Sequence, residues 1–267
     1  MATLLLVHAH PDDESVATGG VMLRAHQQGH RVVLVTATRG ELGEIHNMDE
    51  AEARPRLGEI RTEELRRSCE TLGVDRLEFL GYRDSGMAGE GSNDDPRSFH
   101  KASLAEAGER LAAILREERP DVVVTYTPDG TYGHPDHIKA HHTTLAALDL
   151  LEREGWQPAK AYLHAIPRTF IKQMAERARE AGIDMGEGGI RILGIPDEEI
   201  TTVVDVGDLV QQKIASFRAH VSQNNPNSPF QTMAAQIFQS VFGTERFILA
   251  RGALGEERPE PSLFEGV

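Results

Sequence analysis

Two short motifs bring histidine and aspartate together in a way that indicates metal chemistry. The first is "HAHPDDE", directly after the apolar run "LLLV" near the amino terminus, and the second is "GHPDH", in the middle of the chain. Imidazole and carboxylate groups bind zinc and related divalent cations, and three protein ligands with one open position are typical of a catalytic site. We therefore predict that His10, one of the neighbouring Asp12 and Asp13, and His137 hold one metal ion.

The two aspartates of the first motif predict separate roles. Zinc lowers the pKa of a water molecule towards neutrality, and a carboxylate that is free of the metal can take the proton. The spacing alone does not decide whether Asp12 or Asp13 is the ligand.

Two simpler interpretations compete with a metal site formed by both motifs. Acids at a helix amino terminus are favoured by its dipole, which explains one carboxylate but not the cluster. A metal pair could also form from His137 and His141, four apart on one predicted helix.

The elements that would position these motifs alternate between strands and helices. Apolar runs predict strands at 3–9, 31–38, 76–82, 121–128 and 159–166, separated by helices at 15–29, 59–74, 103–120 and 135–154. This pattern predicts an α/β fold, a Rossmann-like and mostly parallel sheet with helices on both faces. Each motif follows a strand at its carboxyl end. The motifs would face each other if the first and fourth strands are neighbours at the switch point of the sheet.

The last third of the chain is less regular. The elements predicted there are helices at 169–182 and 209–221 and strands at 201–206 and 246–251, which would extend one edge of the sheet. Two long polar loops, 39–58 and 84–102, follow strands on the side where such sheets bind ligands. We expect one domain over 1–267, in which 1–165 form the core with both motifs and 166–267 form a less regular C-terminal part.

Composition and charge narrow the range of partners. The chain has 267 residues, of which 39% are hydrophobic, and a formal net charge of −14. Such an acidic chain repels phosphate backbones and anionic membrane surfaces, so we expect neither nucleic acid nor a membrane as a partner. We find no apolar run of about 18 residues, no signal-peptide pattern and only one cysteine, Cys69, which we expect to be buried and inert. These features predict a cytoplasmic protein, and a homo-oligomer is compatible with them.

The motifs "AHPDDE" and "HPDH" together resemble the LmbE-like (PIG-L) zinc deacetylases, most of all the branch that removes the acetyl group from N-acetylglucosaminyl-inositol in mycothiol synthesis. The resemblance covers the first 165 residues well and the remainder loosely. It implies that His10, Asp13 and His137 hold zinc, although iron(II) could occupy the same ligands, and that Asp12 is the general base. The implied reaction is hydrolysis of the N-acetyl group of a glucosamine derivative, such as a glucosaminyl-inositol or a related thiol-cofactor precursor.

The resemblance also implies roles for the second motif. His134 would be the general acid or help to stabilise the oxyanion, and Asp136 would orient its ring. Tyr132 would polarise the amide oxygen, since a phenol can donate to a developing oxyanion without adding a full charge. These side chains and Asp12 would make up the catalytic set.

Three charged residues resemble the sugar-binding residues of the mycothiol branch: Glu44, Arg61 and Asp84. Acids and guanidinium groups can hold sugar hydroxyls through charge-assisted hydrogen bonds. The C-terminal piece "KIASFRAHVSQ" resembles a further family element, but we expect its histidine, His220, to lie outside the substrate pocket.

Two other functions are compatible with the motifs. A related branch of the family is an amidase of mycothiol-type S-conjugates, which usually has a lysine soon after the first motif and a proline before the second histidine cluster. This chain has no lysine between Val16 and Gly20, and it has Gly133 before His134, which favours the deacetylase. The second alternative is a non-catalytic, metal-containing ligand-binding protein. The spare carboxylate argues against it, because binding alone needs no base.

Overall fold

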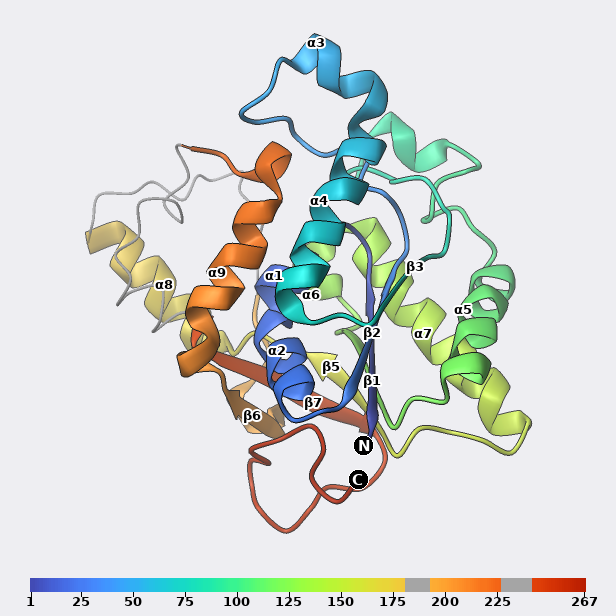
Figure 1. The fold of residues 1–267 in the computed structure, drawn as a ribbon, viewed down its shortest axis with the longest axis vertical. Coiled ribbons are helices and arrows are strands. Elements are labelled where there is room, and N and C mark those ends of the chain that lie inside the picture. Colours follow the sequence, from blue (N-terminus) through green and yellow to red (C-terminus); the bar gives the residue numbers. More distant parts are fainter. Residues whose placement is uncertain (181–192, 227–241) are drawn as a thin grey trace.

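A mixed β-sheet forms the centre of the computed structural model, which describes residues 1–180, 193–226 and 242–267 (Figure 1). The strands of these residues are β1 (Thr3–His8), β2 (Arg31–Thr36), β3 (Arg76–Phe79), β4 (Val122–Tyr126), β5 (Lys160–His164), β6 (Thr202–Asp205) and β7 (Thr244–Arg251). Their order across the sheet is β3-β2-β1-β4-β5-β7-β6. Strands β1 to β5 pair in parallel, whereas β7 runs antiparallel to β5 and β6.

Helices cover both faces of this sheet. The helices of the described residues are α1 (Asp13–Ala17), α2 (Gly19–Gln27), α3 (Glu50–Ala53), α4 (Leu57–Leu72), α5 (Leu104–Glu118), α6 (Gly130–Gly133), α7 (Pro135–Arg153), α8 (Arg168–Glu180) and α9 (Val210–Ala219). Helices α5 and α7 lie on one side of the sheet, and α2, α4 and α9 lie on the other (Figure 1). The predicted fold class, a Rossmann-like and mostly parallel sheet between helices, is therefore confirmed.

The packing of β1 explains why residues 4–7 of this strand are all apolar. Leu5 and Val7 pack in the core on the α5–α7 side, and Leu4 and Leu6 pack in the core on the α2–α4 side. All four are fully buried. Successive side chains of a strand point to opposite faces, so a strand that is covered on both faces has no polar side.

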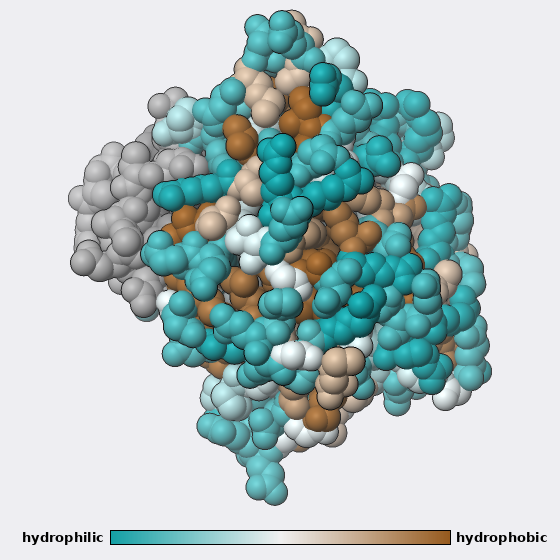
Figure 2. Space-filling view, viewed as in Figure 1, coloured by the Kyte–Doolittle hydropathy of each residue, from teal (hydrophilic) through white to brown (hydrophobic). Residues whose placement is uncertain are grey.

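The outer surface is predominantly hydrophilic. In Figure 2, hydrophilic residues cover most of the visible face, and the hydrophobic residues that can be seen lie mostly near its middle, between hydrophilic ridges. Within the described residues, no helix is both long enough and apolar enough to cross a membrane.

The two motifs meet at the switch point of the sheet. Strand β1 pairs with β2 on one side and with β4 on the other, so the direction of chain progress reverses between β1 and β4. Helix α1 follows β1, and α7 follows β4 after the short α6. Because neighbouring parallel strands end at the same edge, the segments after β1 and β4 lie side by side. The condition under which the two motifs would face each other, that the first and fourth strands are neighbours, is therefore met.

The single helix predicted at 15–29 is wrong, because two helices, α1 and α2, meet at Thr18. Thr18 has φ −140° and ψ 9°, which interrupts the helical path. The amino end of α2 is stabilised by Glu245, whose carboxylate accepts hydrogen bonds from the N–H groups of Gly20 and Val21 at 2.8 Å each. Glu245 belongs to β7, far away in the sequence, so no local pattern near the first motif could predict this break.

The two predicted loops contain short helical segments. Residues 39–58 include α3 and the first residues of α4, and residues 84–102 include a 3-10 turn, η2 (Gly91–Asp94). The helix predicted at 169–182 corresponds to α8, and the last two residues of that prediction lie outside the described residues.

The C-terminal part joins the same sheet through β6 and β7. The segment after β7 is also anchored to it. Glu260 is fully buried, and its carboxylate accepts hydrogen bonds from the Lys160 ammonium and the Tyr162 hydroxyl at 2.7 Å each. On this basis we propose that residues 1–267 form one domain, as the sequence predicts.

Replacing Glu260 with glutamine should destabilise the fold by about 3 kcal/mol at neutral pH, because the buried Lys160 ammonium loses its counter-charge. Burial alone would raise the pKa of Glu260, but hydrogen bonds from Gly255, Lys160 and Tyr162 lower it. A lowered acid pKa contributes stability above the unfolded pKa, and this contribution is lost as the pH falls through the folded pKa. Thermal unfolding should therefore show a large difference between wild type and variant at neutral pH and a smaller one in acid. Equal unfolding temperatures at neutral pH would contradict the assignment.

Candidate active site and metal centre

The turn after β1 and the amino end of α7 bring the predicted metal ligands together. Asp13 lies between two histidines: its Oδ1 is 3.3 Å from His137 Nε2, and its Oδ2 is 3.6 Å from His10 Nδ1. All three side chains are nearly buried, with exposures of 13% for Asp13, 2% for His137 and 9% for His10. The three predicted ligands therefore lie close together at the switch point of the sheet, with Asp13 between His10 and His137.

Two combinations of residues in the surrounding cluster have ligand atoms that all lie within 4.8 Å of one another, and neither combination contains Asp13. One combination is His10, His134 and His137, and the other is His10, Asp84 and Asp136. His10 is common to both, and its Nε2 is 3.2 Å from Asp136 Oδ2 and 3.5 Å from Asp84 Oδ1. The cluster could therefore hold a metal ion, with His10 at its centre.

The two histidines of the alternative pair, His137 and His141, have different hydrogen-bond and ion-pair partners. His141 Nδ1 lies 2.8 Å from the backbone carbonyl oxygen of Tyr126, whereas His137 Nε2 faces Asp13. His141 also belongs to neither of the two further combinations among the described residues.

The cluster carries more carboxylates than positive groups. Burial by itself lowers the pKa of His10, but the carboxylates of Asp84, Asp13 and Asp136 outweigh it and raise that pKa well above its usual value. Burial disfavours the charged form of Asp13, but His137 and His10 hold its pKa well below the usual range. A positive charge is therefore needed where these carboxylates meet, from a protonated His10 or from a divalent cation.

Asp12 lies beside this cluster and keeps a different environment. Its Oδ2 accepts a hydrogen bond from Arg61 Nη2 at 3.1 Å, and its side chain is 28% exposed. Burial raises the pKa of Asp12 to about 6; Arg61 opposes this shift and Asp13 adds to it. A raised pKa and access to a pocket are the properties expected of a general base.

A hydrogen bond joins His134 and Asp136 of the second motif. His134 caps the amino end of α7, and its Nδ1 accepts a hydrogen bond from the backbone N–H of Asp136 at 3.1 Å. The Asp136 carboxylate instead accepts hydrogen bonds from Ser85, from its backbone N–H at 2.9 Å and from its hydroxyl, and it faces His10. Asp136 thus contacts the ring of His134 through its backbone amide, while its carboxylate is bound elsewhere.

This contact decides which nitrogen of His134 carries the hydrogen. Because Nδ1 accepts, Nε2 is protonated in the neutral ring. Burial lowers the pKa of His134 to about 3, and the neighbouring His10 and His137 add to this effect, so the ring is neutral at physiological pH. The hydroxyl of Tyr132 lies 3.5 Å from His137 Nε2, and Tyr132 and His134 both line the pocket. Both side chains are therefore hydrogen-bond donors at the pocket wall.

The three predicted sugar-binding residues line the same pocket but differ in their freedom to move. Glu44 lies at the rim with its side chain 84% exposed, and its carboxylate lies 3.1 Å from His46 Nε2, while its backbone carbonyl oxygen accepts a hydrogen bond from the Gln223 side chain. Arg61 is buried, and besides Asp12 its guanidinium donates to the carbonyl oxygens of Pro11 and Gly40. Arg61 is therefore part of the frame around the turn of the first motif.

Asp84 is also part of the pocket frame. It is buried, and its carboxylate accepts hydrogen bonds from the backbone N–H groups of Leu42 at 3.1 Å and Gly86 at 2.9 Å. It thereby ties the loop after β2 to the loop after β3. Sugar binding by Glu44, Arg61 and Asp84 stays a prediction.

Two residues that the sequence analysis did not single out hold the cluster in place. The Tyr126 hydroxyl donates to Asp13 Oδ2 at 2.7 Å and accepts from the backbone N–H of Ala9 at 2.9 Å, and Ser85 holds the carboxylate of Asp136. Such partners orient the ligands of metal sites. The available signals were weak: Tyr126 ends a strand on the ligand-binding side, and Ser85 lies within a long polar loop.

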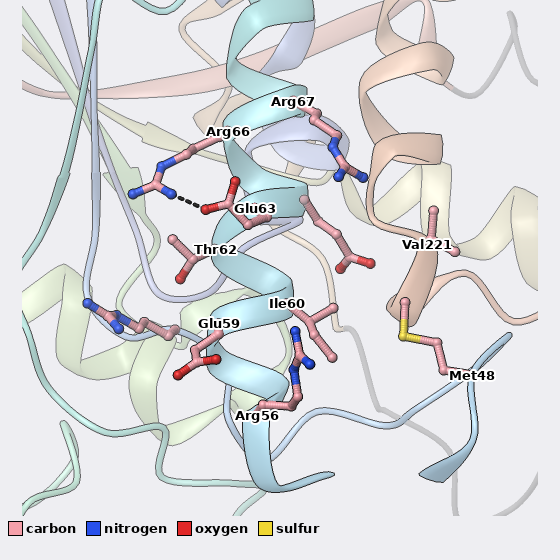
Figure 3. Close-up of a pocket in the computed structure, with 11 residues that line it drawn as sticks. Met48, Arg56, Glu59, Ile60, Thr62, Glu63, Arg66, Arg67 and Val221 are labelled. Carbon is pink, nitrogen blue, oxygen red and sulfur yellow. Dashed lines mark hydrogen bonds and ion pairs between the residues drawn. The ribbon is translucent and has the colours of Figure 1, made fainter. Parts of the chain in front are cut away.

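The pocket that His10, Asp12, Asp13, Tyr132 and His134 line has a volume of about 300 Å³. A larger concavity of about 680 Å³ runs along α4 (Figure 3). One wall includes Arg56, just before α4, and Glu63 and Arg67 of α4, and the opposite wall includes Met48 and Val221. None of the clustered histidines lines this concavity. The residues capable of chemistry therefore gather in the smaller pocket.

The fold and the site together define a Rossmann-like α/β protein with a candidate metal centre at its switch point. Residues 5–148 match the PIG-L family, described as GlcNAc-PI de-N-acetylase. The chain belongs to this family, as its two motifs predict.

Individual relatives agree with this assignment. The 1D-myo-inositol 2-acetamido-2-deoxy-alpha-D-glucopyranoside deacetylase of Acidothermus cellulolyticus is 42% identical, and the match covers 99% of this chain and 95% of that protein. The structure of N,N'-diacetylchitobiose deacetylase from Pyrococcus horikoshii has a TM-score of 0.63 at 22% identity, covering 93% of this chain and 83% of that one.

The fold alone does not decide the reaction. GalB, the 4-carboxy-2-hydroxymuconate hydratase from Pseudomonas putida KT2440, has a TM-score of 0.57 at 20% identity, covering 96% of this chain and 99% of that one. Two differently named activities thus occur on similar folds, as is common for α/β architectures. The family match and the relative at 42% identity, in contrast, confirm the prediction of a deacetylase.

Proposed function

We propose that the protein is a metal-dependent hydrolase that removes the N-acetyl group of a glucosamine derivative, with an acetylated glucosaminyl-inositol as the first candidate substrate. One observation carries the proposal: the partly exposed carboxylate of Asp12 lines the same pocket as His10, Asp13 and His134 of the histidine–aspartate cluster. The name of the relative at 42% identity supports this choice of sugar. A cytoplasmic location, the lack of nucleic-acid and membrane partners, and compatibility with a homo-oligomer stay predictions of the sequence.

We propose that His10, Asp13 and His137 hold the metal ion, zinc or iron(II). The donor set fits such an ion, because two imidazole nitrogens lie 3.6 and 3.3 Å from the two oxygens of one carboxylate that is only 13% exposed. Tyr126 and Asp136 support Asp13 and His10 through hydrogen bonds. When bound, the ion would polarise the acetyl carbonyl group and make water more acidic.

The proton transfers and the hydrogen bonds belong to protein side chains. Asp12 takes a proton from the attacking water as the new C–O bond forms at the acetyl carbon. Tyr132 and Nε2–H of His134 donate hydrogen bonds to the oxygen on which negative charge develops. Asp12 then gives the proton to the leaving nitrogen as the C–N bond breaks, which releases acetic acid and the free amine. The neutral ring of His134 favours the second of its two predicted roles, oxyanion stabilisation.

Replacing His134 with alanine should lower kcat by about 10²- to 10³-fold, the usual cost of removing one oxyanion donor. His134→Gln should recover part of this loss, because its amide N–H can reach a position near that of Nε2 and the role requires a donor without titration. Steady-state kinetics of the two metal-reconstituted variants measure the difference. A glutamine variant as slow as the alanine variant would favour the general-acid role instead.

The proposed function is tested by incubating metal-reconstituted protein with a panel of acetylated amino sugars and measuring acetate release. We expect release that a chelator abolishes and that metal restores, with the acetylated inositol glycoside among the best substrates. A mycothiol-type S-conjugate in the same panel tests the amidase alternative. If fully metallated protein released no acetate from any sugar but bound one of them, a non-catalytic ligand-binding protein would be the better account.

A further inference from the structure

Glu14, the last residue of the first motif, forms a buried pair with His220 that has no part in the proposed chemistry. Glu14 and His220 are both fully buried, and His220 Nε2 is 2.7 Å from Glu14 Oε1. The same carboxylate oxygen accepts hydrogen bonds from the hydroxyls of Ser15 at 2.8 Å and Ser68 at 2.5 Å. Through this one oxygen atom, Glu14 of α1 therefore binds Ser68 of α4 and His220, which lies in the C-terminal part of the chain.

The other oxygen of Glu14 holds the backbone of Asp12. Glu14 Oε2 accepts a hydrogen bond from the Asp12 N–H at 2.9 Å. Asp12 has φ 108° and ψ −28°, a backbone conformation that residues other than glycine rarely adopt. Such a conformation persists only where the surroundings hold it, and it is often found at functional sites. Glu14 holds this turn from behind, while Arg61 binds its carboxylate and the carbonyl oxygen of Pro11.

His220 is itself placed by packing that does not involve the pocket. It lies between α9 and the 3-10 turn η5 (Val221–Gln223). In this turn, the backbone N–H and hydroxyl of Ser222 both donate to the Glu64 carboxylate of α4 at 2.7 Å. Figure 3 shows Val221 of η5 facing α4. The α9–η5 corner is thus fastened to α4, and it presents His220 to Glu14 from a fixed position.

We infer that Glu14 and His220 are positioning residues for Asp12: the pair holds the Asp12 backbone in the conformation that directs its carboxylate into the pocket. This inference rests on the proposed function, in which Asp12 is the base. According to this inference, the C-terminal part of the chain helps to position Asp12 through His220, although His220 does not line the pocket.

The contacts predict which kinetic constant will change. The Glu14 carboxylate is hydrogen-bonded to Asp12, Ser15, Ser68 and His220, and none of these bonds involves a proposed metal ligand. Loss of the pair should therefore misplace the base without releasing the metal and without removing a substrate contact. A general base that is displaced by about 1 Å costs on the order of 10²-fold in rate.

Two amides of different length test this inference at position 220. In His220→Gln the amide nitrogen can reach the place of Nε2, whereas in His220→Asn it matches Nδ1 and falls short of Glu14. We expect the asparagine variant to lose about 10- to 100-fold in kcat, with KM within about threefold of wild type and the metal content unchanged. The glutamine variant should regain most of the kcat. Glu260→Gln, which breaks a buried ion pair elsewhere in the fold, is the matched control and should keep kcat at a temperature where it is folded.

Three results would overturn the inference: wild-type kcat in a folded His220→Asn, a loss confined to KM, or loss of the metal. If the asparagine variant does not fold, Ser68→Ala removes another donor to Glu14 and should lower kcat alone by about threefold or more; an unchanged kcat would then count against the inference. Wild-type protein is assayed in parallel. If it released no acetate from the sugar panel, the proposed function would fail, whatever the variants showed.

Discussion

Asp12→Asn should bind metal as the wild type does and turn over substrate about 10²- to 10⁴-fold more slowly, because an amide cannot take the proton from water. Asparagine suits this test for structural reasons. Asparagine tolerates a positive φ better than most residues other than glycine, and its side-chain oxygen can still accept the hydrogen bond from Arg61. The variant should therefore keep the shape of the turn and lose only the base.

Two measurements on Asp12→Asn check this expectation. Metal content by mass spectrometry should match that of wild type, and steady-state kinetics should show the loss in kcat. Asp149→Asn is the matched control, since it removes a carboxylate that is half exposed and pairs with Arg251 away from the pocket. Its rate should be unchanged. Normal turnover by Asp12→Asn would show that another group is the base.

His10→Ala and His137→Ala should each lose the metal, with an affinity at least about 100-fold lower than that of wild type, because each removes one of three ligands. Turnover should fall with the metal content. His142→Ala is the matched control: it removes an exposed histidine from the same helix, α7, and should keep both metal and activity.

Metal content after dialysis against a weak chelator, followed by acetate release, measures both effects of these substitutions. A fully metallated and active His137→Ala would remove His137 from the ligand set. The remaining combination of His10, Asp84 and Asp136 would then be the candidate centre.

The parallel α/β fold, and the position of each motif at the carboxyl end of a strand, could be predicted because both follow from local patterns. Which strands are neighbours was left open by the sequence and comes from the structure. A strand covered on both faces must be apolar throughout, which identifies β1 and β4 in the sequence. Parallel strands end at one edge, so motifs that follow two such strands converge when the strands are neighbours. The family resemblance of the motifs then supplied residue roles that spacing alone left open, such as the choice between Asp12 and Asp13.

The support of the site could not be predicted, because it depends on contacts between distant segments. The carboxylate of Asp136 faces His10 and Ser85 rather than His134, a choice made by the loop after β3. Asp84 resembles a sugar-binding residue of the family in the sequence, and in the structure its carboxylate oxygens accept hydrogen bonds from backbone N–H groups of two loops. No periodicity or spacing encodes such pairings.

The contact between Glu14 and His220 illustrates the same point. Glu14 reads as one more acid of the first motif, and His220 as a histidine at the end of a helix more than 200 residues later. Only the packing of α9 against α4 brings them together and places them behind Asp12.

The central claim is that one divalent cation joins the turn after β1 to the amino end of α7. Anomalous diffraction from crystals of zinc-reconstituted protein tests it most directly. The account predicts one strong peak at bonding distance, about 2.0–2.2 Å, from His10, Asp13 and His137, with Asp12 close by but not bonded to it. A peak bonded to Asp84 and Asp136 instead, or no peak between the two motifs in protein that retains zinc, would contradict the account.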